Sequence, residues 1–441
     1  MSRRYERAAV VFVYISLFTL ALSCVLQPIS WSPDGRWIAL TRCIQSKESD
    51  SGKTEASELW IISPSPIERR RLFATPQMML SGPSWASDGK RIYVVELPED
   101  KTSGPCILWE IPLEGKPRQI VRLLNTGEQG GAVFAAPAIS PDGKRVAFVR
   151  NKSNVIIAGT DGQVQRAIEV ESQSTVLWSS DGRWLVCMGG GDQEPSVHFF
   201  DTQSSEVLPL DVRFQNGAWL PDGKRFVAVK KHTGEGPEKF SVSVLDGIAS
   251  RREVSSFELD FKPVGPLVPS RQGDAVFVAR EESDVRLPAI CKLDLRTGKS
   301  EVIYETAGVM CVWSLSPDGR SLAFRESPIG KDSGARSFVG VLDLRATTEP
   351  LYLAVDDREW AEVVKAYSDE LKKVGTDKIK PSEEKTARLA FAQLERFVAA
   401  FRRDFPQSSL LPDSVAAVKE VQATYKQAGI ILNPGGGAIA W

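Results

Sequence analysis

Histidine is nearly absent, since His198 and His232 are the only two in 441 residues. Histidine is the usual acid–base group near neutral pH and the commonest metal ligand, so its scarcity leaves little for His-based catalysis or metal binding. His198 stands in an alternating stretch that predicts a strand, and His232 lies in a polar segment that predicts a loop. We therefore expect structural or solvated roles for both, and we predict no catalytic residue, no metal site and no cofactor.

Several other chemical signatures are missing. The sequence contains no G-x-S-x-G nucleophile elbow and no H-E-x-x-H zinc motif. A formal net charge of −1 supplies no broad positive field for nucleic acid, which we exclude as a partner. The six cysteines form no C-x-x-C pair, which argues against zinc or redox-motif chemistry, and no disulfide pairing is assigned. They are Cys24, Cys43, Cys106, Cys187, Cys291 and Cys311.

The uncharged run Ala8–Ser23 spans sixteen residues and is short for a membrane-crossing helix, which needs about twenty. Arg3, Arg4 and Arg7 precede it, which is the order of a bacterial export signal. Small residues then stand just before Cys24. Residues 1–23 are therefore predicted to be a signal peptide or lipoprotein signal, with Cys24 as the lipidated residue.

Two alternatives for the N-terminus stay open, namely ordinary cleavage after Ser23 and an uncleaved anchor through Leu26. All three place the chain outside the cytoplasm, in the periplasm or on a membrane facing the periplasm or exterior. Residues 24–28 would form a short tether that reaches no more than about 18 Å, so the following domain would lie against the membrane surface.

A repeated turn-and-strand string decides the fold. It occurs seven times, for example ISWSPDGRWIALTR from Ile29 and PAISPDGKRVAFVR from Pro137, with turns spaced 39 to 54 residues apart. That spacing is close to the length of a four-stranded propeller blade. Six of the seven copies carry Asp-Gly, whereas the sixth copy along the chain carries Gln272-Gly273 instead. The turn aspartates are Asp34, Asp88, Asp142, Asp181, Asp222 and Asp318.

The chemistry of each turn predicts a hairpin. Proline pre-sets the first central residue, aspartate accepts a hydrogen bond from the backbone two residues later, and glycine takes the positive φ at the exit. An aromatic or apolar residue such as Trp31 or Trp85 stands three positions before the turn aspartate or its replacement in most copies, where we expect it to pack between blades. A ring of carboxylates that binds cations is the functional alternative for these aspartates, but hairpin geometry already explains their recurrence.

A second hairpin follows each first one, which gives four strands in each of seven units. Twisted four-stranded sheets with one repeated interface close radially. The sequence therefore predicts a mainly β chain with a seven-bladed β-propeller over 29–354, a six- or eight-bladed ring being the alternative. Whether residues 30 to 60 form a complete blade or share strands with the last one stays open.

The repeats resemble the TolB-like propeller family, whose blades contain S-P-D-G-(K/R) followed by an apolar strand and a later D-h-x-x-G, where h is apolar. The first, third and seventh copies match the first half closely, and Asp294 with Gly298 matches the second. The resemblance covers about three quarters of the chain. TolB itself has six blades and an N-terminal extra domain, whereas seven copies and a C-terminal extension occur here, so TolB's partner is not implied.

The pattern changes to helical after Leu353. Apolar residues from Trp360 to Val374 recur at helical spacing, Pro381–Glu384 opens a second helix, and a third is predicted from about Asp413 to Ala428. We expect a helical domain over 355–431 and a flexible tail over 432–441. The helices would pack together or against one propeller face, or they would dock a partner.

The function predicted from these features is a non-enzymatic binding or scaffold protein of the cell envelope, which engages a protein or peptide and is held at the membrane by its N-terminus. The alternative is a hydrolase of peptide or glycan whose carboxylates come from several blades and meet in the channel. A binder should expose an apolar patch, whereas an enzyme should gather carboxylates with shifted pKa values in the channel.

Overall fold

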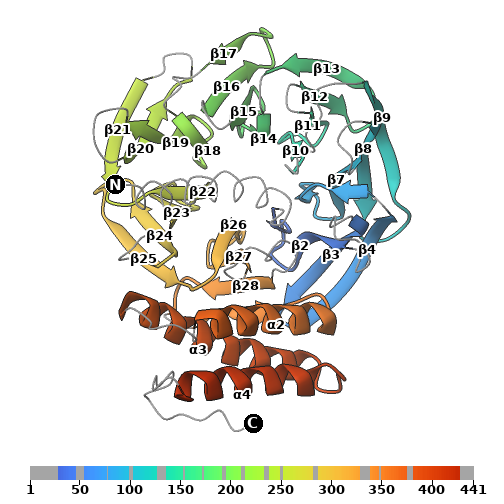
Figure 1. Cartoon of the computed structure of the whole chain (residues 1–441). Helices are drawn as coiled ribbons and strands as arrows, with labels where there is room; N and C mark the ends of the chain where they lie inside the picture. Colours follow the sequence, from blue (N-terminus) through green and yellow to red (C-terminus); the bar gives the residue numbers. More distant parts are fainter. Residues whose placement is uncertain are drawn as a thin grey trace, which may run out of the picture.

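The chain forms a seven-bladed β-propeller followed by three helices, as the sequence predicts (Figure 1). This computed structural model describes residues 28–427 apart from 46–53, 77, 99–102, 127–135, 152–153, 171–172, 191–194, 210–213, 233–237, 249–251, 282–286, 328–337, 347–348 and 375–380. The predicted signal peptide, Cys24 and the C-terminal tail lie outside the described residues. Within them, no helix is long and apolar enough to cross a bilayer.

Every blade is an antiparallel sheet whose strands follow the order of the chain from the centre of the ring outward. The first blade comprises β1 (Ser30–Trp31), β2 (Ile38–Gln45), β3 (Thr54–Pro64) and β4 (Ile67–Pro76). The second comprises β5 (Met78–Leu80), β6 (Ser84–Trp85), β7 (Arg91–Pro98), β8 (Ser103–Pro112) and β9 (Arg118–Thr126). The third comprises β10 (Ala138–Ile139), β11 (Arg145–Asn151), β12 (Asn154–Gly159) and β13 (Val164–Glu169). In the second blade both β5 and β6 pair with β7, so its innermost strand is interrupted.

The remaining four blades each contain four strands. The fourth comprises β14 (Gln173–Trp178), β15 (Trp184–Gly190), β16 (Pro195–Asp201) and β17 (Val207–Pro209), and the fifth comprises β18 (Phe214–Trp219), β19 (Arg225–His232), β20 (Lys239–Asp246) and β21 (Arg252–Leu259). The sixth comprises β22 (Pro263–Pro269), β23 (Ala275–Arg280), β24 (Ala289–Asp294) and β25 (Ser300–Glu305). The seventh comprises β26 (Val309–Leu315), β27 (Ser321–Ser327), β28 (Phe338–Asp343) and β29 (Leu351–Leu353).

The ring closes without exchange of strands between the first and last blades. Strand β1 pairs with β2 in its own sheet, so residues 30 to 60 belong to a complete blade. The two blades meet side by side instead, and the indole Nε1 of Trp31 donates to the carbonyl of Ser314 on β26 at 3.0 Å. Arg325 of β27 also donates to the carbonyl of Thr41 on β2 at 2.9 Å.

The tryptophans before the turns join neighbouring blades. Besides Trp31, the indoles of Trp85, Trp178 and Trp219 each donate to a backbone carbonyl on the innermost strand of the preceding blade, at 3.0, 3.0 and 3.4 Å. The prediction that these residues pack between blades is confirmed. Their hydrogen bonds fix the position of one blade on the next, which packing alone would leave less specific.

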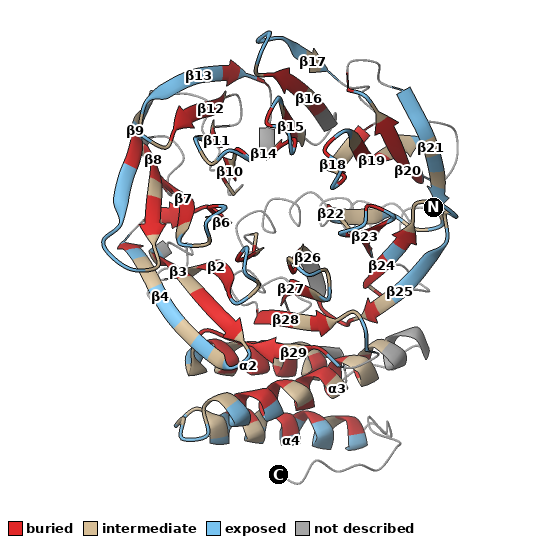
Figure 2. Ribbon diagram, turned by 180° about the vertical axis from the view of Figure 1, so that it is seen from behind, coloured by how far each residue is buried: buried red, intermediate tan, exposed pale blue. Residues whose placement is uncertain are grey.

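The hydrophobic core is divided among the seven blade-to-blade interfaces, each with its own cluster of buried side chains. Figure 2 shows this pattern as buried inner strands and exposed outer strands. The cluster between the sixth and seventh blades differs from the others, because it continues outward into the helices. The helical layer is therefore an extension of the propeller core.

Three helices cover the outer edge of the ring, namely α2 (Asp357–Val374), α3 (Pro381–Asp404) and α4 (Leu411–Gln427). They pack on one another, which is one of the predicted alternatives, and lie beside the rim near β28, β29 and β4 rather than on a propeller face (Figure 1). Helices α2 and α3 contact the seventh blade, and α4 packs on both of them from outside. The third helix begins two residues earlier than predicted, at Leu411.

The start of α2 is fixed by its own acidic residues. The carboxylate of Asp356 accepts from the backbone N–H of Glu359 at 2.8 Å, which caps the helix. The side chain of Glu359 turns back to accept from the N–H of Val355 at 2.6 Å. This pair satisfies donors at the helix start, as in a capping box.

Candidate functional site

The turn aspartates are held in closed hydrogen-bonded turns. Asp34 accepts from the hydroxyl of Ser32 at 2.5 Å and from the N–H of Arg36 at 3.0 Å. Asp142, Asp181 and Asp318 also accept both hydrogen bonds, one from the serine hydroxyl two positions before and one from the backbone N–H two positions after. Asp88 and Asp222 accept the backbone bond. The carboxylates thus serve the hairpin geometry, with their side chains at an exposed edge.

The sixth turn shows how the missing aspartate is replaced. Gln272 stands at the aspartate position, but the serine of this turn, Ser270, donates instead to Asp274 at 2.6 Å. Gly273 keeps a φ of +69°, within the range of +66° to +72° that all seven turn glycines share. The sequence shows that Gln272 replaces the aspartate. It does not show that Asp274, two positions later, accepts the hydrogen bond from the Ser270 hydroxyl.

The seven turns touch one another in a closed ring, which we call the turn ring. A Cβ built on the turn glycine of each blade would meet the residue just before the aspartate position of the preceding blade. For Gly35 of the first blade that neighbour is Pro317 of the seventh, at 3.6 Å, and for Gly223 it is Ser180, at 1.7 Å. Glycine is needed here for its positive φ and, at Gly223, for the close approach as well.

Hydrogen bonding keeps the carboxylates of Asp142 and Asp318 ionised. The serine hydroxyl and the following backbone N–H hold the pKa values of Asp142 and Asp318 below their ordinary value. Groups of this kind are poor proton donors near neutral pH. In the turn ring they act as fixed negative charges.

A basic side chain stands directly after six of the seven turn glycines, whereas Asp274 follows Gly273 in the sixth blade. Arg36 pairs with Glu68 on the outermost strand of its blade at 3.3 Å, and Arg183 pairs with Asp201 on the third strand of its blade at 2.7 Å. Lys90, Lys144 and Lys224 are exposed and form no ion pair with any residue that the structure describes. The turn ring therefore carries groups of both charges on one face of the propeller.

The two histidines take structural positions. His198 lies within β16 as predicted. His232 is the last residue of β19 and pairs with Lys239, so its prediction as a loop residue was wrong. Its Nε2 lies 2.9 Å from the hydroxyl of Ser241 on the neighbouring strand, with which β19 stays paired as far as His232.

The side chains of Cys43, Cys106, Cys187 and Cys291 form no disulfide. Burial raises the pKa values of Cys106 and Cys187 to about 12, so these thiols are not reactive nucleophiles. The part of the chain that is described contains no group of three or more His, Cys, Asp or Glu side chains placed to hold a metal ion.

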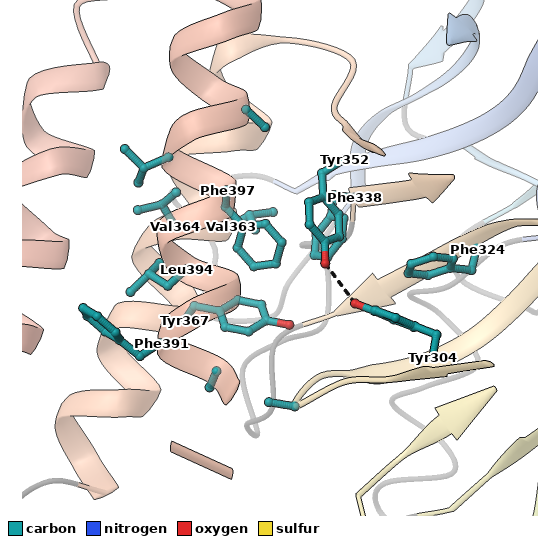
Figure 3. Close-up of a cluster of buried hydrophobic side chains, with 14 of the residues drawn as sticks. Tyr304, Phe324, Phe338, Tyr352, Val363, Val364, Tyr367, Phe391, Leu394 and Phe397 are labelled. Carbon is teal, nitrogen blue, oxygen red and sulfur yellow. Dashed lines mark hydrogen bonds between the residues drawn. The ribbon is translucent and has the colours of Figure 1, made fainter. Parts of the chain in front are cut away.

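A buried polar cluster lies where the helices meet the propeller, and it was not predicted from the sequence; Figure 3 shows its three tyrosines, Tyr304, Tyr352 and Tyr367, among the hydrophobic side chains that surround it. Its centre is Glu326 of β27, whose residue surface is fully buried. The carboxylate accepts from Thr306 and Tyr367, both at 2.5 Å, and from Tyr304 and Gln393, both at 3.3 Å. No local motif identifies the cluster, because its members come from two blades and two helices.

A second cluster lies at the start of α2 and contains both signs of charge. Arg42 of β2 bonds Glu58 at 2.7 Å and the helix cap Asp356 at 2.8 Å. Glu359 is buried beside it, and burial raises the pKa of Glu359 to about 7 although Arg42 acts in the opposite direction. This cluster attaches α2 to the first blade, across the point where the ring closes.

Comparisons with known proteins support the fold and nothing finer. The chain matches no protein-family model and no curated protein. An oligogalacturonate lyase in complex with manganese has a similar structure, with a TM-score of 0.51 and 11% identity over 68% of this chain and 84% of that one. Hydrazine synthase of Kuenenia stuttgartiensis matches 75% of this chain and 96% of its own, at 16% identity and a TM-score of 0.47.

At these identities the likeness to the lyase extends to the propeller architecture alone. Membership of the TolB-like family stays a prediction from the repeats.

Proposed function

We propose that this chain is a TolB-like binding or scaffold protein of the cell envelope, and that its turn ring engages a protein or peptide partner. The observation that carries the proposal is the turn ring itself. Seven turns in mutual contact form a rigid, exposed surface that needs little ordering when a partner binds. Because it carries groups of both charges, it suits a polar segment with charges of both signs.

The distribution of shifted pKa values favours binding over catalysis. In the described part of the chain the carboxyl groups with raised pKa values are Glu326, Glu359 and Glu395. All three lie in or under the helical layer at the rim, and none belongs to the turns around the centre. A channel-centred hydrolase would place such groups in the channel, so no observation on these residues favours that alternative.

The exposed apolar residues do not provide the patch expected of a binder. Five large ones are exposed among the described residues, and each lies on the outermost strand of a different blade. They are Leu124, Val164, Val207, Val254 and Val302. Because they are spread around the rim, a polar contact at the turn ring suits the proposed partner better than an apolar one.

Charge reversal in the turn ring tests the proposal. We expect Lys90→Glu with Lys144→Glu to reduce recovery of the partner at least about tenfold, because the two lysines stand on adjacent touching turns and reversal introduces repulsion. The measurement is affinity capture of the full-length protein from its native envelope, with the same partner quantified by mass spectrometry. Both lysines are exposed, so the fold should be unchanged by circular dichroism.

Lys419→Glu with Lys426→Glu on α4 is the matched control and should recover the partner like the unaltered chain. Equal recovery from both double variants would contradict a role for the turn ring. Recovery of a small glycan or peptide instead of a protein would move the proposal to the hydrolase.

Envelope location is a separate part of the proposal and rests on the N-terminal sequence. We expect Cys24→Ala to remove lipid labelling and to shift the protein from the membrane fraction to the soluble one, whereas Cys43→Ala should change neither. Metabolic labelling with a fatty acid and fractionation measure both effects. Unlabelled wild-type protein that stays in the membrane fraction would point to the uncleaved anchor.

A further inference from the structure

Glu326 occupies an unusual position between the propeller and its helices. Its carboxyl group is enclosed by Tyr304 and Thr306 from the sixth blade, Tyr367 of α2 and Gln393 of α3. Tyr352 of β29 completes the enclosure, with its hydroxyl 2.9 Å from that of Tyr304. Figure 3 shows the three tyrosine hydroxyl groups directed into the space between the helices and the blades.

The cluster joins the helices to the ring through its hydrogen bonds. Gln393 donates to Tyr304 at 3.0 Å and to Thr306 at 2.8 Å, and its Oε1 accepts from the N–H of Ala307 at 3.1 Å. Tyr367 bonds Glu326 directly. Both helices that contact the seventh blade therefore donate a hydrogen bond to this one carboxyl group.

No positive charge compensates Glu326 among the described residues. All of its hydrogen-bond donors are neutral side chains, and the titratable groups that face it are Tyr304, Tyr352 and Tyr367. Burial raises the pKa values of all three phenols above the ordinary value, so they stay neutral. On α3, Arg396 is paired with Glu349 at 2.6 Å and bonds none of the cluster.

A buried carboxylate without a cation is unfavourable, whereas a neutral carboxyl group is tolerated. Burial raises the pKa of Glu326 from 4.5 to about 7, against the effect of the four donors. Protonation gives the group an O–H of its own, and the tyrosine hydroxyl oxygens beside it can accept a hydrogen bond.

We propose that Glu326 is a proton-controlled latch, which holds the helical layer on the sixth and seventh blades when its carboxyl group is neutral and loosens that contact when the group ionises. The proposal concerns the attachment of the helices, and it holds whichever ligand the propeller binds.

The direction of the pH effect follows from the raised pKa. Protonation favours the docked state, so the contribution of Glu326 is complete below about pH 4.5 and is lost as the pH rises toward 7. With values of 4.5 undocked and about 7 docked, this one group lowers the docking constant by about 70-fold between pH 5 and pH 8. Above about pH 8 the group is ionised in both states and its effect stays constant.

Hydrogen exchange of the whole chain at several pH values tests the latch, with exchange times corrected for the intrinsic pH dependence. We expect the opening constant of α2 and α3 to rise with pH more steeply in the wild type than in Glu326→Gln, by about 70-fold in total from pH 5 to pH 8. Glu359 also titrates in this layer, but it does so in both proteins and cancels in the comparison. Glu362→Gln on α2 should behave as the wild type.

Tyr367→Phe provides a second and independent test. It removes a donor to the ionised carboxylate, so the pKa of Glu326 should rise and the end of the pH effect should move to higher pH. A purely structural role of Tyr367 would weaken docking equally at every pH. This variant keeps the proposal testable if Glu326→Gln does not fold.

Two results would overturn the latch. One is an identical pH dependence in wild type and Glu326→Gln, together with no shift in Tyr367→Phe. The other is a pH-dependent opening that is equally large in β11 to β20, far from the helices, because the group would then affect only global stability.

Discussion

A chain that ends at Asp356 is expected to be much less stable than the full-length protein, because removal of α2 to α4 uncovers the core between the sixth and seventh blades. The rings of Phe338 and Tyr352 in the seventh blade pack against Phe397 of α3, with centroids 4.5 and 5.0 Å apart. Trp360 of α2 stacks on Phe338 at 6.3 Å. Each such side chain contributes about 1.5 to 3 kcal/mol when fully buried, so even partial exposure of several of them removes a large part of the stability of a domain.

Thermal unfolding and size-exclusion chromatography measure this effect. We expect the shortened chain to aggregate or to melt well below the full-length protein. A chain that ends at Gln427 keeps all three helices and should melt like the full-length protein. Equal melting of the chain that ends at Asp356 would show that the propeller core is complete without the helices.

Because the helices stabilise the propeller, a truncation that removes them has two effects at once. A partner lost on truncation could be lost because the propeller unfolds, so truncation alone cannot assign a docking role to the helices. Point variants on exposed positions, such as the lysines of α4, leave the core intact. They separate a contact with a partner from support of the ring.

The turns and blades were predictable from the sequence because they are local. The bond between Ser32 and Asp34 and the positive φ of Gly35 involve adjacent residues, and seven copies make the pattern unmistakable. The position of Trp31 between blades followed from its recurrence. Its hydrogen bond to Ser314 did not, because the acceptor lies at the other end of the propeller sequence.

The contact between the helices and the propeller could not be predicted either, because its residues lie far apart in the sequence. The helices themselves follow from the spacing of apolar residues, but the spacing does not say what their buried faces contact. Glu326 belongs to a strand of alternating pattern and has no local feature that marks it as buried without a cation. Its partners Tyr367 and Gln393 follow 41 and 67 residues later.

Asp404 is expected to be the most sensitive single residue of the helical layer. Its side chain is 1% exposed and forms an ion pair with Arg69 of β4, which is 14% exposed. It also accepts from the indole of Trp360 at 3.4 Å. The guanidinium of Arg69 bonds the carbonyl of Ala354 at 2.6 Å as well, so this contact joins α3, the seventh blade's exit and the first blade.

We expect Asp404→Ala to lower the free energy of unfolding by about 3 kcal/mol, because it leaves the Arg69 charge buried without its carboxylate. Chemical denaturation measures the change. Asp369→Ala is the matched control, since it removes an exposed pair with Lys365 on α2 and should cost about 0.3 to 0.5 kcal/mol.

The double variant Asp404→Ala with Arg69→Met decides whether the pair or the packing matters. If the uncompensated charge causes the loss, removal of both partners should recover most of it, because two apolar groups can replace a buried ion pair at little cost. If the double variant is as unstable as the sum of its single variants, the pair is not coupled and the effect of Asp404 comes from its other contacts. Recovery would instead show that the loss in Asp404→Ala comes from the Arg69 charge left buried without its carboxylate.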